Sequence, residues 1–206
     1  MLFKRAFQGS DQNLRDKYLI QELIYFERYC RDQKHWEEMK KCFDEKGTVN
    51  ISWYNGSGWG FVDASEKMQS HAPHKINNIL VWINGNKAVA ECIASIQIRV
   101  EIEGNYYDLT SYVRLHYKTV KKTSGDWYIF AMDAIYEKDT LIPMYPVQPL
   151  ADIGEAIKKY RPSYANLTYS LSRSGHTIND SLPGEDRPDL IAALYTQSDI
   201  WLKEQI

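Results

Sequence analysis

The chain has 206 residues, a mass of 24.1 kDa and a formal net charge of −2 from 25 basic and 27 acidic side chains. A sequence pI of about 6.2 argues against nucleic-acid binding through a basic face, which usually needs a pI above roughly 9. No apolar run approaches the roughly 20 residues of a membrane-spanning helix, and the N-terminus lacks the apolar stretch of a secretory signal. We therefore expect a globular cytoplasmic protein that binds neither nucleic acid nor membrane.

The spacing of cysteines and histidines argues against a disulfide framework and a metal centre. The three cysteines are odd in number and lie far apart, at positions 30, 42 and 92. The histidines show no zinc-binding spacing, and the glycine motifs that bind phosphates and dinucleotides are absent. We expect reduced, mostly buried thiols and no bound metal.

The N-terminal part of the chain predicts two helices. In the first, which Ser10 or Asp11 can cap, one apolar stripe recurs at helical spacing. The stripe consists of Leu19, Leu23, Phe26 and Cys30, and the charged residues Glu22, Glu27, Arg28 and Arg31 lie off it. After a short break at 32–34, residues 36–43 predict a second helix.

The chain then changes period. Val49, Ile51 and Trp53 alternate with polar residues, as they would in a strand. Glycines are frequent over residues 54–60, and we interpret this stretch as a flexible aromatic flap because it lacks the spacing and the lysine of a phosphate loop. A short helix is expected to begin near Asp63.

Four long strands are expected next, over residues 74–83, 87–103, 106–121 and 127–137. The turns between them are short, so neighbouring strands must be antiparallel. A sheet of this length curls because strands twist, and the two N-terminal helices are its natural cover. The sequence thus predicts an α+β fold in which a curved antiparallel sheet is closed by the N-terminal helices, with an apolar pocket between the two layers.

From Leu141 onward the chain becomes richer in proline and short helical patterns. A short helix is expected over residues 152–160, and a last helix carries an apolar stripe that includes Leu190 and Leu194. This segment is too short to hold much core of its own. We therefore divide the chain into a main domain, residues 1–140, and a helical extension, residues 141–206, that packs on the domain or on a partner subunit.

Several short motifs accompany this order of elements. They are Tyr29-Cys30-Arg31-Asp32 followed by His35-Trp36 and Cys42-Phe43, then residues 74–78 and 83–88, and Gly125-Asp126-Trp127 at the start of the last strand. Over about residues 10–138 the chain resembles the SnoaL-like branch of the nuclear transport factor two-like superfamily. That branch includes polyketide cyclases, scytalone dehydratase and bile-acid dehydratases.

The resemblance implies a cone-shaped α+β barrel of the cystatin-like type, with a pocket that the helices close. It also implies proton-transfer chemistry, namely dehydration, isomerisation or cyclisation, without a metal or an organic cofactor. Many relatives of this kind have no known reaction, and several only bind ligands or act as scaffolds. A non-catalytic ligand-binding or dimeric scaffold protein is therefore the alternative.

His74 and Asp32 are the leading catalytic candidates. An imidazole can take and return a proton near neutral pH, and the resemblance places His74 where the dehydratases have their catalytic histidine. Asp32 matches the aspartate that pairs with this histidine and fixes its tautomer. The resemblance also implies a tyrosine where this chain has Glu27, so Tyr29 or Tyr54 is the candidate donor to an oxyanion. A hydrogen-bonded rim histidine and a helix-capping aspartate are the plainer interpretations.

Further candidates for substrate binding are Trp53, Tyr54, Trp59, Asn78, Asp108, Tyr112 and Asp133. The aromatic members suit ring-shaped ligands by stacking, unless they only anchor their loop on the sheet. Asp108 and Tyr112 share a polar strand face with Arg114 and His116, and such a face is expected to meet solvent or a dimer partner more often than a pocket. Asp133 lies in an apolar run, where a carboxylate is functional or pairs with an arginine.

Together with these residues, the resemblance implies a cofactor-independent lyase or isomerase that acts on a small hydrophobic, oxygenated molecule. His74 would be its general base and acid, oriented by Asp32. We also expect a homodimer, because the outer face of the sheet carries apolar residues such as Val89 and Ile93 that the N-terminal helices cannot cover.

Overall fold

The structure is a computed structural model that describes residues 2–4, 10–68, 71–146 and 151–204. Its centre is a six-stranded sheet in the order β2-β1-β6-β5-β4-β3. The strands are β1 (Phe43–Ile51), β2 (Tyr54–Ser57), β3 (His74–Asn84), β4 (Lys87–Ile102), β5 (Asn105–Lys121) and β6 (Trp127–Pro143). The four long strands are antiparallel neighbours, as predicted, whereas β1 pairs in parallel with β6.

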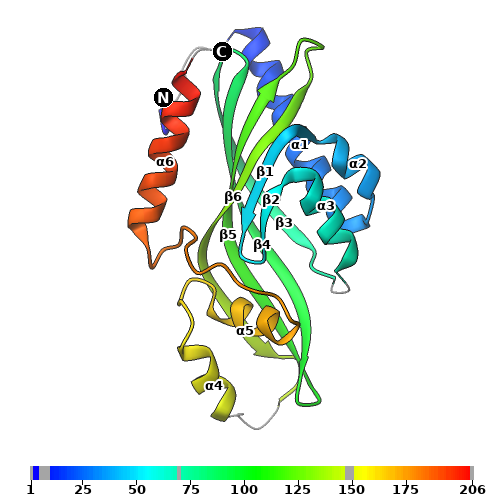
Figure 1. Cartoon of the computed structure of the whole chain (residues 1–206), viewed down its shortest axis with the longest axis vertical. Helices are drawn as coiled ribbons and strands as arrows, with labels where there is room; N and C mark the ends of the chain where they lie inside the picture. The colour runs from blue at the N-terminus through cyan, green and yellow to red at the C-terminus, as the bar shows by residue number, and fades with distance from the viewer. Residues whose placement is uncertain (1, 5–9, 69–70, 147–150, 205–206) are drawn as a thin grey trace.

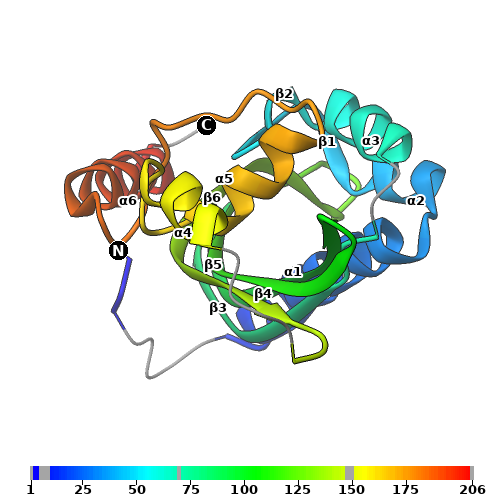
Figure 2. The ribbon, with the colours of Figure 1, turned by 90° about the horizontal axis from the view of Figure 1, so that it is seen from below.

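The helices cover both faces of this sheet, which curls without closing (Figure 2). They are α1 (Asp11–Gln33), α2 (Trp36–Lys41), α3 (Gly58–Lys67), α4 (Ala151–Lys158), α5 (Ala165–Arg173) and α6 (Pro188–Lys203). Figure 1 shows α1 to α3 on one side of the sheet, α6 on the other, and α4 and α5 near one end of the long strands. None of the described helices is long and apolar enough to cross a membrane. The predicted α+β fold with a curved antiparallel sheet is confirmed.

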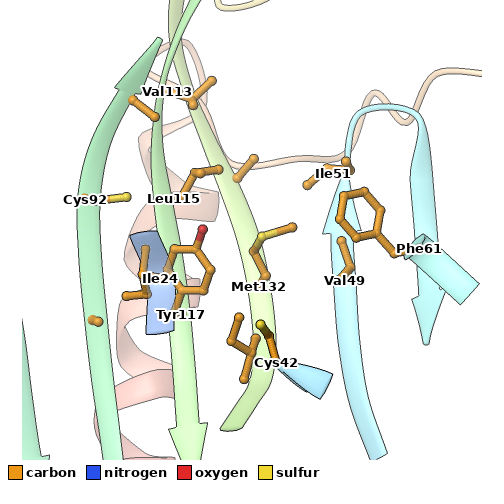
Figure 3. Packing of buried hydrophobic residues seen from close by; sticks show 14 of the residues in the cluster. Ile24, Cys42, Val49, Ile51, Phe61, Cys92, Val113, Leu115, Tyr117 and Met132 are labelled. Atoms are coloured by element: carbon orange, nitrogen blue, oxygen red, sulfur yellow. The ribbon is translucent and has the colours of Figure 1, made fainter. Parts of the chain in front are cut away.

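The main core fills the space between α1, α3 and the inner face of the sheet. Figure 3 shows Ile24 of α1, Phe61 of α3 and Tyr117 of β5 among the side chains that meet there. In β5 the odd-numbered residues, such as Leu115 and Tyr117, are buried in this core, because successive side chains of a strand point to opposite faces. The pleat therefore decides which residues can line an internal site.

The buried face of α1 is rotated by about one residue position from the predicted apolar stripe. Ile20 and Ile24 are fully buried, whereas Phe26 of the predicted stripe is exposed. The same stripe continues into Glu27 and Arg31, which are also buried. Apolar spacing alone missed this rotation because it assumes that charged side chains face water.

The glycine-rich segment is not the flexible flap that the sequence predicted. It forms β2 and the first turn of α3, where the Ser57 hydroxyl accepts a hydrogen bond from the backbone N–H of Gly60 at 3.1 Å. A Cβ atom at Gly58 would lie 2.5 Å from the ring of Phe43. Glycine is needed there for close packing of α3 against β1, so its frequency reflects tight contact rather than mobility.

The outer face of the sheet is covered by the chain's own C-terminal helix. Val89 is fully buried against Leu202 of α6 and Leu2, with Trp82 and Trp201 beside them. The homodimer was predicted because Val89 was expected to be uncovered, and this reason does not hold, since α6 covers Val89. Ile93 remains 43% exposed, and the homodimer stays a prediction.

The extension shares the core of the main domain. Tyr164, Leu167 and Leu171 belong to the same hydrophobic cluster as the N-terminal helices. In addition, β6 runs to Pro143, past the predicted end of the last strand. The division into residues 1–140 and 141–206 stays a prediction, and the shared cluster shows that residues beyond 140 help to enclose the interior.

We predict that Leu202→Ala lowers the free energy of unfolding by about 2–5 kcal/mol, the usual cost of removing a buried leucine side chain. Urea unfolding followed by circular dichroism measures this change. The matched control is Ile200→Ala, an exposed position on the same helix, which should change stability by less than about 0.5 kcal/mol. Equal effects of the two substitutions would show that α6 is not fastened through this contact.

Candidate active site

A cavity of about 50 Å³ lies in the core where α1, α3 and α5 meet the inner face of the sheet. Its polar lining residues are Arg28, Arg31, Ser52, His74 and Tyr136. The remaining wall is aromatic and aliphatic and includes Trp53, Phe61, Met68, Ile98, Leu115, Met132 and Leu171. The site therefore combines a few polar groups with an apolar wall, which is the usual composition of a small-molecule pocket.

His74 and Asp32 are held together at one side of this cavity. Asp32 lies in the last turn of α1, rather than after the helix as predicted, and His74 is the first residue of β3. The backbone N–H of His74 donates to Asp32 Oδ2 at 2.7 Å, and its ring Nδ1 lies 2.7 Å from Asp32 Oδ1. The carboxylate accepts the Nδ1–H, so that Nε2 keeps its lone pair.

Nε2 of His74 faces a guanidinium. It lies 3.4 Å from Nη1 of Arg28, which can donate to the Nε2 lone pair. The other two nitrogens of Arg28 donate to the carboxylate of Glu27, and both residues are buried. The ion pair with Glu27 thus fixes the guanidinium of Arg28 and leaves Nη1 close to the imidazole.

Burial controls the protonation of the pair. It lowers the pKa of His74 to about 4; the hydrogen bond to Asp32 opposes this shift, and the charge of Arg28 adds to it. Burial raises the pKa of Asp32, but the hydrogen bonds from His74 outweigh it and hold that pKa below its ordinary value. At neutral pH the site holds a neutral imidazole beside an ionised carboxylate, which is the protonation state that a general base requires.

A second arginine lines the same cavity. Arg31 is 7% exposed; its guanidinium donates to the sulfur of Met68 at 3.6 Å and lies 5.7 Å from the ring centre of Trp36. Burial, together with the neighbouring charge of Arg28, lowers the pKa of Arg31 to about 10, so it stays charged at neutral pH.

Sequence reasoning missed the two arginines and Glu27 as site residues. A signal was present, because Glu27, Arg28, Arg31 and Asp32 are spaced so that they share one side of a helix. A charged face of this kind is usually solvated. Only the position of β3, which brings His74 over α1, shows that this face points inward.

The predicted aromatic residues are divided between the cavity and the surface. Trp53 lines the cavity. Tyr29 is 56% exposed and stacks on the ring of His35 at 5.9 Å, so it cannot donate to an oxyanion beside His74. The Tyr54 hydroxyl donates to the backbone carbonyl of Ser57, and Trp59, in the first turn of α3, is exposed. Tyr29 lies outside because the buried stripe of α1 is rotated from the predicted one.

None of the polar residues predicted to bind the substrate, namely Asn78, Asp108, Tyr112 and Asp133, lines the cavity. Asn78 is exposed at an irregularity of β3, and Asp108 forms an exposed ion pair with Arg99 at 2.8 Å. Tyr112 lies on the outer face beside Lys138, and Asp133 accepts from Asn50 at 3.2 Å. Asp108 and Tyr112 therefore lie on the face of β5 that points away from this cavity.

That polar face is covered by the chain itself at two positions. Arg114 donates to the Tyr195 hydroxyl at 2.7 Å, and His116 lies 2.9 Å from the hydroxyl of Ser198. Both partners belong to α6. Arg114 and His116 therefore fasten the C-terminal helix instead of meeting solvent or a second copy.

A larger open hollow of about 880 Å³ adjoins the cavity. Met68, Ile98 and Leu171 line both spaces and form the neck between them. Burying a reactive imidazole behind an apolar neck restricts its access to solvent. In the part of the chain that the structure describes, no group of three His, Cys, Asp or Glu side chains could hold a metal ion.

Known proteins share this sequence pattern and this fold. Pea pathogenicity protein 2 of Fusarium vanettenii is 27% identical over 187 residues, which cover 87% of this chain and 79% of that protein. A candidate scytalone dehydratase from Novosphingobium aromaticivorans superimposes with a TM-score of 0.55 and 18% identity, over 69% of this chain and 98% of the other. A type 2 hexachlorocyclohexane dehydrochlorinase gives a TM-score of 0.59 and 14% identity, over 69% of this chain and 99% of the other.

Structural likeness at such low identity shows a common fold. The family assignment comes instead from the sequence, because residues 12–133 match the SnoaL-like domain. This match covers more than half of the 206 residues and includes nearly all of α1, all of β3 and the beginning of β6. The chain therefore belongs to the SnoaL-like domain family.

Proposed function

We propose that this protein is a lyase or isomerase that works by proton transfer, with His74 as general base and acid. The proposal is supported mainly by one observation: a buried imidazole, whose Nδ1 lies 2.7 Å from a carboxylate oxygen, lines a largely apolar cavity. General bases contribute roughly 10²–10⁴-fold to rate when they are positioned within reach of the proton they remove.

In an elimination, Nε2 of His74 removes a proton from carbon. The electron pair of that C–H bond forms a carbon–carbon double bond as the leaving group departs from the neighbouring carbon with its own bonding pair. The imidazolium then gives its proton to the departing hydroxide or, if chloride leaves, to water. Asp32 remains ionised throughout and stabilises the imidazolium.

Arg28 supplies the complementary positive charge. Its Nη1 lies 3.4 Å from Nε2, next to the position of the reacting carbon, so its N–H can donate to an oxygen on which negative charge develops. In an isomerisation the same imidazole returns its proton to another carbon of the substrate. Elimination and isomerisation thus begin with the same step and need no further catalytic side chain.

The names of the structural neighbours agree with this chemistry. Dehydrochlorination and dehydration are both eliminations, in which a base removes a proton and a leaving group departs from the adjacent carbon. Because the fold likeness carries no substrate information, we infer only the reaction class from it. The cavity volume of about 50 Å³ favours a small reacting group over a polycyclic one.

We predict that His74→Ala lowers kcat/KM by roughly 10²–10⁴-fold, since it removes the general base. The assay presents a panel of small β-hydroxy and β-chloro ketones and follows the absorbance of the conjugated enone product. The control is His71→Ala, which changes an exposed histidine outside the cavity and should leave the rate unaltered. If His74→Ala keeps full turnover of a substrate that the wild-type protein converts, His74 is not the base. Binding without turnover across the panel would support the non-catalytic alternative.

The pH profile tests the protonation state. A base works only when it is unprotonated, so kcat/KM should stay constant from neutral pH down to about 5 and fall as the pH drops through the pKa of His74, which is lowered to about 4. An apparent pKa near the ordinary histidine value of about 6.5 would contradict an enclosed base.

Asp32→Asn should lower kcat by roughly 10²–10⁴-fold, because the amide no longer selects the Nδ1–H tautomer or stabilises the imidazolium. The acidic midpoint of kcat/KM should not rise in this variant, because Asp32 normally raises the pKa of His74. Steady-state kinetics from pH 3.5 to 8 measure both effects. A midpoint that moves toward neutral pH would contradict the conclusion that Asp32 raises the pKa of His74.

A further inference from the structure

Arg31 is a buried cation without an acidic partner. It is 7% exposed, and within the described residues no carboxylate lies at ion-pair distance from its guanidinium. Its contacts are the weakly accepting sulfur of Met68 and the ring of Trp36. Arg28, one turn earlier on the same helix, is instead bound by Glu27.

A buried charge without a partner lowers the stability of the fold. Folded proteins therefore normally bury a charged side chain only where an opposite charge pairs with it. A guanidinium has five N–H donors in a planar fork that matches the two oxygens of a carboxylate. Arg31 lines the same cavity as His74, so its unused donors are available to a bound molecule beside the base. The missing partner is therefore best supplied from outside the chain.

We propose that the substrate carries a carboxylate and that Arg31 binds it, placing the rest of the molecule against His74. This inference rests on the proposed function and names the class of its substrate as a small organic acid. The carboxylate and the reacting carbon would occupy the inner cavity of about 50 Å³. The remainder would extend past Met68 and Leu171 into the hollow of about 880 Å³.

The outer hollow has the charge that such a ligand requires. Lys67 and Arg173 line it and form no ion pair with any described carboxylate, whereas Arg99 is neutralised by Asp108. Glu101 is the acidic residue among the lining side chains. The net positive wall attracts anions toward the neck, because a charged concave surface concentrates ions of opposite sign.

Binding can be tested without knowledge of the natural substrate. Calorimetric titration at pH 7 with straight-chain monocarboxylates from acetate to octanoate, and with benzoate, should find at least one that binds at least tenfold more tightly than its own primary amide. The amide has nearly the same shape without the charge. Equal affinity for every acid and its amide, or no binding of any acid, would overturn the proposal.

The variants assign the effect to Arg31. Arg31→Met should weaken binding of that acid by roughly 10–100-fold, the effect expected for hydrogen bonds to a charged group. Arg31→Lys keeps the charge without the planar fork, so its affinity for the acid should lie between those of the wild type and Arg31→Met. Arg15→Met, an exposed arginine on the same helix, is the control and should bind as the wild type does. Unchanged binding by Arg31→Met would refute the assignment.

Two measurements distinguish a loss of carboxylate binding from a loss of folding and from a failure of the proposed catalytic function. Urea unfolding should find Arg31→Met at least as stable as the wild type, because it removes an unpaired buried charge. A strong loss of stability would mean that the arginine serves the fold and would count against a ligand-binding role. His74→Ala should still prefer the acid over its amide, so carboxylate binding stands or falls independently of catalysis.

Discussion

The site depends on one contact between two segments that are distant in the sequence. Asp32, in the last turn of α1, accepts hydrogen bonds from both the backbone and the ring of His74 at the start of β3. This double contact fixes the end of the helix over the sheet and selects the tautomer of the imidazole. The same carboxylate thus has a structural role and a chemical role, since the geometry that anchors α1 also leaves Nε2 unprotonated beside Arg28 in the lining of the cavity.

Around that contact the protein buries more charge than a core usually contains. Glu27 and Arg28 neutralise each other, Asp32 accepts hydrogen bonds from His74, and Arg31 has no carboxylate at ion-pair distance among the described residues. Low polarity around these groups strengthens every interaction between them and keeps the imidazole neutral at physiological pH. Desolvation is therefore the cause that links the packing of α1 to the proposed chemistry.

The two faces of the sheet have separate tasks. Inward-facing residues such as Leu115 and Met132 form the wall of the cavity, whereas outward-facing Arg114 and His116 hold α6. Covering the outer face with its own C-terminal helix leaves the chain less dependent on a partner at Val89. Meanwhile Leu171 of α5 contributes to the neck of the cavity, so the extension takes part in enclosing the site.

The sequence alone determined the long antiparallel strands and the N-terminal helices, because turn signals and helical periodicity are local properties of the chain. The pairing of His74 with Asp32 was implied by the resemblance to the SnoaL-like branch. It did not determine which way α1 rotates, and so it placed Tyr29 in the site and left Arg31 out. It also took the glycines near Phe43 as a sign of mobility. Those outcomes were decided by tertiary packing, since whether a charged side chain is solvated or buried depends on the opposing strand that covers it.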